Sequence, residues 1–202
     1  EKFTLVDGAF CYLEFGNFEK LSHSQYGSII REIETNTSRS KEEFVAKYHD
    51  KYDEEHYLPF WMVAELSSFG MMSRVFQHSD HNVKVPISKR FNLHSSILSS
   101  WLHSLTNVRN ICAHHARLWN RVLPVKPKMP PKKYLPEFFE PLRINNERYF
   151  VILTVIKYLL DYIEPDNTFI EQFQTLLSEH PEVPIEKMGL PENWEEYPIF
   201  GL

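Results

Sequence analysis

The sequence predicts an all-α protein. Apolar residues recur with the helical period through most of the 202 residues, and no segment shows the strict apolar–polar alternation of a strand. Capping signals and prolines divide this pattern into helix-sized segments. With 43% hydrophobic and 24% charged residues, the composition excludes disordered, collagen-like and coiled-coil proteins.

Local signals place the first helices. Residues 1–22 predict no clear element. The sequence SKEE at 40–43 has the spacing of a capping box, in which the serine and glutamate side chains satisfy free backbone donors, so it predicts a helix over 40–52. Pro59 is favoured in the first turn of a helix and predicts a second helix over 59–76.

The second half contains the longest predicted helix. Ser88 or Asn92 caps it, and it ends before Pro124. The five prolines that follow, between 124 and 136, predict an extended loop. Two further helices follow. Asn145 or Asn146 caps an apolar one that runs to about 163, and a capping box at 168–171 opens one that Pro181 ends.

After these helices, an aromatic C-terminal tail is expected to pack on the body of the protein. The longest apolar run has twelve residues and contains Lys157, so no membrane span is expected. The two cysteines, Cys11 and Cys112, lie far apart in the sequence. They predict neither a disulfide framework nor a zinc site, and they suit the cytoplasm.

Charge is distributed unevenly along the chain. The net charge is −5, but residues 66–136 contain eleven basic residues and one acid, whereas the remainder contains eleven basic and 26 acidic residues. A positive face that binds a polyanion such as RNA explains this segregation, and a solvated run of charge is the alternative. In the proline-rich loop, four lysines either track an RNA backbone or remain solvated: Lys126, Lys128, Lys132 and Lys133.

A helical wheel drawn through residues 108–122 separates two faces. His115 falls among the apolar residues and is expected to be buried, and His103 extends the polar face toward the helix start. The apolar face contains Val108, Ile111, Cys112, Leu118, Trp119 and Val122. The polar face contains Arg109, Asn110, His114, Arg117 and Arg121.

The polar face carries the groups that RNA cleavage without a metal requires. A guanidinium binds phosphate oxygens, an amide orients a phosphate or hydroxyl, and an imidazole moves a proton near neutral pH. In that reaction the 2′-hydroxyl attacks the adjacent phosphorus, and cations stabilise the added negative charge. An ordinary polar surface is equally consistent with this spacing. No metal and no cofactor are expected, although His78 and His81 flank an acid in a predicted interhelical loop.

Three stretches resemble one family. RNICAHHARLWNR at 109–121 resembles the signature of the Abi-like abortive-infection family of bacterial phage-defence proteins, the AbiD and AbiF group. WMVAELSSFG at 61–70 and MGLPENW at 188–194 resemble two further segments of that family. The resemblance extends from about 44 to 194.

The resemblance implies a HEPN-like helical bundle that forms one domain over residues 1–202. Active members of the HEPN superfamily cleave RNA without metal through an arginine and a histidine separated by four to six residues, usually where two copies of the motif meet. The matching residues are Arg109 and His114, with Asn110 in the polar position after the arginine. Family members usually carry further N-terminal helices, which are not found before Glu1.

The leading hypothesis is therefore a metal-independent endoribonuclease of phage defence in the cytoplasm, which acts as a homodimer or under the control of a partner. It assigns catalysis to Arg109, Asn110 and His114, and assigns RNA binding to Arg117, Arg121, His103 and the four loop lysines. One alternative is a non-catalytic RNA-binding module associated with a structured small RNA. The other is a helical protein-interaction subunit with an antitoxin or similar partner.

Overall fold

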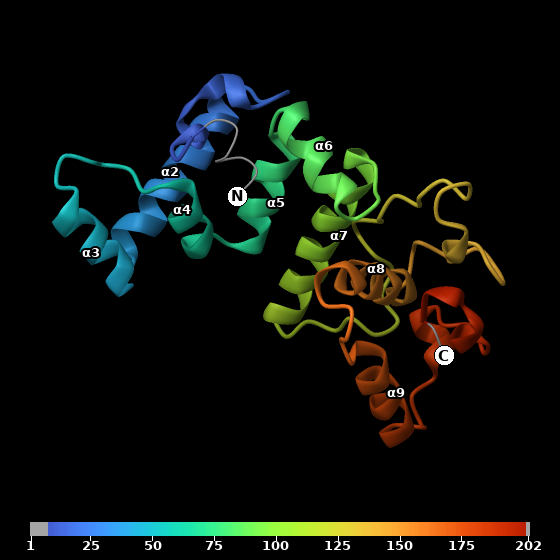
Figure 1. Ribbon diagram of the computed structural model, residues 1–202. Helices are drawn as coiled ribbons and strands as arrows, with labels where there is room; N and C mark the ends of the chain where they lie inside the picture. Colours follow the sequence, from blue (N-terminus) through green and yellow to red (C-terminus); the bar gives the residue numbers. More distant parts are fainter. Residues whose placement is uncertain (1–7, 201–202) are drawn as a thin grey trace. The chain divides into compact units, whose positions relative to one another are not determined.

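The computed structural model describes residues 8–200, and its regular elements are α-helices and short 3-10 helices (Figure 1). An isolated antiparallel bridge between Phe18 and Ser79 is the one strand-like pairing in this range. The all-α prediction is therefore confirmed. The chain divides into two compact units, Glu1–Lys89 and Arg90–Leu202, and each is described separately.

In the described part of the first unit, from residue 8 on, five α-helices surround one apolar core. Two 3-10 turns, η1 (Cys11–Leu13) and η2 (Phe15–Asn17), precede them in the region that gave no clear sequence signal. Tyr12, Ile29, Leu58 and Met71 are among the fully buried side chains. The helices are α2 (His23–Arg39), α3 (Glu43–Lys51), α4 (Phe60–Leu66), α5 (Phe69–His78) and α6 (His81–Lys89).

Helix α2 begins at a capping box that the sequence analysis missed. The Ser22 hydroxyl accepts a hydrogen bond from the Gln25 amide at 3.2 Å, and the Gln25 side chain accepts one from the Ser22 amide at 2.9 Å. The capping box predicted at 40–43 is wrong. Ser40 forms the C-cap of α2 and its hydroxyl accepts from the Glu42 amide, so α3 begins at Glu43.

The single helix predicted over 59–76 is two helices. The chain breaks at Ser67, whose hydroxyl donates to the Val63 carbonyl at 2.6 Å, and Ser68 caps α5 by accepting from the Met71 amide at 3.1 Å. Serine side chains compete with the backbone for its hydrogen bonds, which favours a new helix start here. Helix α6 contains Pro86 and was not predicted.

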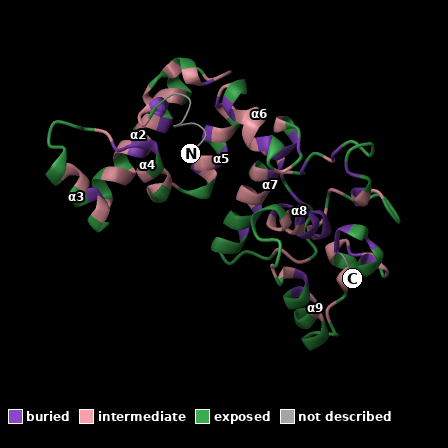
Figure 2. Cartoon of the chain, in the orientation of Figure 1, coloured by how far each residue is buried: buried purple, intermediate pink, exposed green. Residues whose placement is uncertain are grey.

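The second unit is built around α8 (Tyr149–Ile163), a helix with a long run of buried residues (Figure 2). Helices α7 (Ser95–Ala113) and α9 (Phe169–Glu179) belong to the same unit, together with η3 (Pro136–Phe138). The C-terminal tail forms three more 3-10 turns: η4 (Ile185–Met188), η5 (Trp194–Glu196) and η6 (Pro198–Phe200).

The aromatic tail packs as predicted. The ring centroid of Phe150 in α8 lies 5.4 Å from that of Tyr197 and 5.7 Å from that of Phe200. The ring centroid of Phe173 in α9 lies 5.5 Å from that of Trp194. The three tail rings are buried. Aromatic pairs at these distances add to the stabilisation that comes from area burial alone.

Two of the predicted helix starts in this unit are wrong. Helix α7 is capped by His94, whose Nδ1 accepts from the Ser96 amide at 3.2 Å, because the Ser88 hydroxyl is bonded within α6 and Asn92 has a φ of +50°. Helix α8 begins at Tyr149, after a turn in which Asn145 accepts from the Glu147 amide.

Helix α9 begins at Phe169 and ends before Pro181, as predicted, but Thr168 does not form the capping-box bond. Within residues 8–200, no helix is long and apolar enough to span a membrane.

The turn at Gly189 provides a test of the packing between the tail and the start of α8. Its φ is +85°, and a Cβ at this position would lie 2.6 Å from the Cβ of Arg148. We expect Gly189→Ala to lower the free energy of unfolding by roughly 2 kcal/mol, measured by urea denaturation. The control Gly16→Ala meets no atom within 4 Å, and an equal loss in both variants would contradict this packing.

Candidate functional site

Helix α7 ends at Ala113, about ten residues before the predicted end, because a Schellman motif closes it. The His115 amide donates to the Cys112 carbonyl at 2.9 Å, and the Ala116 amide donates to the Ile111 carbonyl at 3.0 Å. These bonds are the 5→2 and 6→1 pair of that motif. His115 occupies the left-handed position with a φ of +52°, where glycine is usual.

This closure corrects the helical wheel beyond Ala113. Arg117 and Arg121 do not lie on α7 but in the connecting segment that follows it, where both are exposed. His115 was expected to be buried, and the structure exposes it because the chain leaves the helix at this residue. The apolar prediction holds for Val108 and Ile111, which are buried, and fails for Cys112 and Val122, which are exposed.

The three predicted catalytic residues lie in the last turn of α7 and at its C-cap, and all three are exposed. Asn110 and His114 are four residues apart and therefore lie on one side of the helix, and Arg109 is adjacent to Asn110. The Arg109 guanidinium donates to the Asn110 side-chain oxygen at 3.1 Å. This bond leaves the Asn110 NH₂ group free to donate to a ligand oxygen.

Three of the last four carbonyls of this helix are satisfied internally. A helix C-terminus carries negative partial charge on its last free carbonyls, which disfavours an approaching phosphate. Here the carbonyls of Asn110, Ile111 and Cys112 accept hydrogen bonds from the three residues that follow the helix. The Schellman motif thereby removes part of the repulsion that an anionic ligand would meet.

The segment after α7 is fastened to the residues that precede α8. Asn120, with a φ of +52°, accepts a 2.9 Å hydrogen bond from the Arg148 guanidinium, and the buried Leu123 donates its amide to the Glu147 carbonyl at 2.8 Å. Trp119 lies beside a mainly apolar cavity of about 300 Å³ that residues of α9 also line. These contacts hold the exposed Arg117 and Arg121 on an ordered segment.

The proline-rich loop is anchored to α7 through the peptide groups of Lys128. The Lys128 amide donates to the Ser100 hydroxyl at 2.9 Å, and the Lys128 carbonyl accepts from the Trp101 indole at 2.8 Å. Trp101 is 1% exposed and stacks on Phe138, with ring centroids 5.4 Å apart. The backbone of the loop is therefore fixed, and the side chain of Lys128 remains exposed.

Two of the four predicted RNA-binding lysines of this loop already have acidic partners. Lys126 lies 2.6 Å from Glu147, and Lys132 lies 3.6 Å from Glu140. Lys128 and Lys133 have no acidic partner among the described residues, and the Lys133 ammonium lies 5.7 Å from the Tyr134 ring centroid. The loop therefore presents two unneutralised charges rather than four.

The same pairing reduces the charge segregation seen in the sequence. Of the eleven basic residues between 66 and 136, Arg74 pairs with Glu32 and Lys84 with Glu19, in addition to the two loop lysines. All four acids lie outside that segment of the sequence. The basic residues of this segment are divided between the two units, which meet in sequence at Lys89 and Arg90.

His103 and the pair His78 and His81 are the remaining residues that the sequence analysis named. His103 is exposed on α7, about two turns before Asn110. His78 and His81 flank the two-residue connection between α5 and α6, as predicted. No group of three His, Cys, Asp or Glu residues within the described part of the chain could hold a metal ion.

Sequence reasoning missed the residues that position the site. Ser100 and Trp101 hold the loop backbone, Asn120 and Arg148 hold the connecting segment, and His115 ends the helix. Of these residues, only His115 could have been identified from the sequence as the end of the helix, since two adjacent histidines interrupt an otherwise regular helical pattern.

The helix end can be tested at His115. A non-glycine residue in the left-handed conformation is strained, and alanine keeps this strain while glycine relieves it. We expect His115→Gly to be more stable than His115→Ala by about 1 kcal/mol in urea denaturation. If α7 instead continued through residue 115, the His115→Gly protein would be less stable than the His115→Ala protein by a similar amount.

Comparison with known proteins gives one match. The family model for Abi-like proteins matches residues 1–120, which include the segment at 61–70 and nearly all of the motif at 109–121, but not the segment at 188–194. Comparisons with curated proteins and with solved structures give no match. Because the family model covers more than half of the chain and includes the last turn of α7, this chain belongs to the Abi-like protein family.

Proposed function

We propose that this protein is a metal-independent endoribonuclease of abortive-infection phage defence, with the HEPN type of active site. The observation that carries the proposal is the exposed group formed by Arg109, Asn110 and His114 at the closed end of α7. Membership of the Abi-like family supports the role in defence. No step of this chemistry requires a metal.

Each residue of the group has a definite role in cleavage. The His114 imidazole moves the proton of the attacking 2′-hydroxyl or of the leaving 5′-oxygen. The Arg109 guanidinium stabilises the charge that develops on the phosphoryl oxygens, and the free Asn110 NH₂ group donates to one of them. The hydrogen bond between Arg109 and Asn110 orients both groups before RNA binds.

The chemistry favours a homodimer. Transesterification uses one base and one acid, and of the two exposed imidazoles at this helix end only that of His114 belongs to the motif of an arginine and a histidine separated by four residues. His103 lies eleven residues earlier on α7, a rise of about 16 Å, which is too far to act on the same phosphodiester. A second copy of the chain, with its own His114 facing the first, supplies the missing group.

The RNA backbone is bound by the cations that have no acidic partner. Lys128 and Lys133 in the loop, and Arg117 and Arg121 after α7, are exposed and lie in the second unit with the catalytic group. Their contacts with phosphates position the substrate without reading its sequence. Lys126 and Lys132 contribute less, because binding RNA would require breaking or sharing their ion pairs.

Cleavage of labelled RNA in EDTA tests the proposal. We expect His114→Ala to lower the single-turnover rate by 10²–10⁴-fold and Arg109→Ala to lower it by about 10²–10³-fold. His115→Gly, which removes the adjacent exposed imidazole and favours the left-handed conformation that ends the helix, is the matched control and should retain activity within a few-fold. Cleavage that survives both substitutions would refute this site. Salt-sensitive binding without any cleavage would indicate the non-catalytic RNA-binding module instead.

The ion pairs of the loop lead to a separate prediction for binding. Each phosphate contact with single-stranded RNA contributes about 0.7 to the slope of log affinity against log salt concentration. Replacing Lys128 and Lys133 with glutamine should therefore reduce that slope by about 1.4 in a fluorescence anisotropy titration. The matched double variant at Lys126 and Lys132 should reduce it much less. Equal reductions would show that the ion pairs do not hold in solution.

A further inference from the structure

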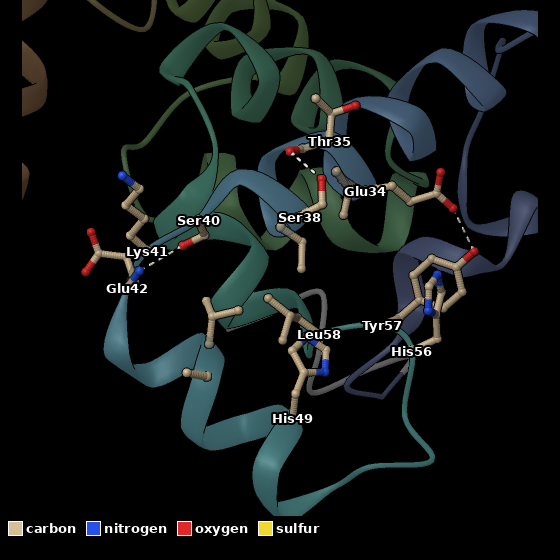
Figure 3. Close-up of a pocket in the computed structure, with 14 residues that line it drawn as sticks. Glu34, Thr35, Ser38, Ser40, Lys41, Glu42, His49, His56, Tyr57 and Leu58 are labelled. Carbon is tan, nitrogen blue, oxygen red and sulfur yellow. Dashed lines mark hydrogen bonds between the residues drawn. The ribbon is translucent and has the colours of Figure 1, made fainter.

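The first unit contains a large pocket that is separate from the proposed nuclease site. It has a volume of about 740 Å³ and lies between the C-terminal half of α2, α3 and residues 56–58 (Figure 3). Its floor is apolar, since Ile33, Val45 and Leu58 line it and are almost completely buried. An apolar cavity of this size with a few polar groups at its edge is typical of a small-molecule site.

Three of the five hydroxyl groups that line the pocket offer acceptors rather than donors. The Thr35 hydroxyl donates to the Arg31 carbonyl at 2.7 Å, and the Ser38 hydroxyl donates to the Thr35 carbonyl at 3.1 Å. The Tyr57 hydroxyl donates to Glu34 Oε1 at 3.0 Å (Figure 3). The hydrogens of these three hydroxyl groups are therefore already used within the protein, and their oxygen lone pairs remain for a ligand.

Glu34 supplies the fixed negative charge of the pocket. Its Oε1 is held by Tyr57, and the second carboxylate oxygen has no hydrogen-bond partner among the described residues. This contact and burial raise the pKa of the Tyr57 hydroxyl, so the tyrosine remains a donor at neutral pH. Lys41 and Glu42, which carry opposite charges, lie together at the rim, away from Leu58 (Figure 3).

Further acidic residues lie beside the pocket. Asp53, Glu54 and Glu55 come directly before His56 and Tyr57, which line the wall, and all three are exposed without a basic partner in the described part of the chain. They add to the negative potential around the entrance. The imidazoles of His49 and His56 can serve as donor or acceptor, so they set no preference for ligand charge.

We propose that this pocket binds a small organic cation, in which an amidinium, guanidinium or primary ammonium group is carried on an apolar body. The cationic head donates hydrogen bonds to Glu34 and to the hydroxyl oxygens of α2, and the apolar body lies on Ile33, Val45 and Leu58. A guanidinium or amidinium suits a carboxylate because it can donate two parallel hydrogen bonds. This site does not depend on the proposed nuclease activity.

Two isosteric probes test the charge preference. Benzamidine and benzamide have nearly the same shape, but only benzamidine is a cation. Titration of the full chain, followed through the backbone amide signals of Ala46 and Leu58, should give a millimolar dissociation constant for benzamidine and roughly tenfold weaker binding for benzamide. Equal binding of the two probes, or binding of neither, would overturn the proposal.

A pair of variants tests the role of Glu34. Glu34→Gln keeps an acceptor for Tyr57 and removes the charge, so it should bind the two probes equally and retain the thermal stability of the parent. Glu43→Gln removes the same charge from a residue that pairs with Lys47 and does not line the pocket, and it should keep the tenfold preference. An equal loss of preference in both variants would show only long-range attraction by an acidic surface and would contradict a specific site.

Discussion

The left-handed conformation of His115 is the constraint on which the proposed site depends. It ends α7 at Ala113 and turns the chain back, so that Arg109, Asn110 and His114 occupy an exposed helix end. The same closure satisfies three of the last four carbonyls of the helix, which makes this end more tolerant of a phosphate. A strained residue next to a proposed catalytic one fits the tendency of strain to cluster at functional sites.

Ion pairs determine which lysines of the proline-rich loop are available to bind an anionic ligand. Lys126 and Lys132 are matched by acids that are distant in the sequence, whereas Lys128 and Lys133 are left for a ligand on a loop whose backbone is held by Ser100 and Trp101. The positive charge that this loop would offer to a polyanion is therefore smaller, and confined to fewer side chains, than the four lysines in the sequence suggest. The first unit has the opposite character at its large pocket, where Glu34 and neighbouring acids favour a cation.

The helical period predicted the fold class and the approximate positions of α3, α8 and α9, because burial of an amphipathic face leaves a clear pattern. It did not predict the break at Ser67 or the closure at His115. Both depend on hydrogen bonds to backbone carbonyls, and the spacing of apolar residues carries no information about such bonds. The three proposed catalytic residues could be chosen from the sequence because they lie within one helical turn and a half. The contact between Asn120 and Arg148, which holds the segment after α7, could not be predicted, because it joins segments far apart in the chain.

The chemical nature of the product ends tests the central claim most directly. RNA cut by purified protein in EDTA can be analysed by mass spectrometry for its termini. Attack by the 2′-hydroxyl, assisted by His114 and Arg109, predicts fragments with 2′,3′-cyclic phosphate and 5′-hydroxyl ends. Intact RNA, or fragments with 5′-phosphate and 3′-hydroxyl ends, would contradict the account.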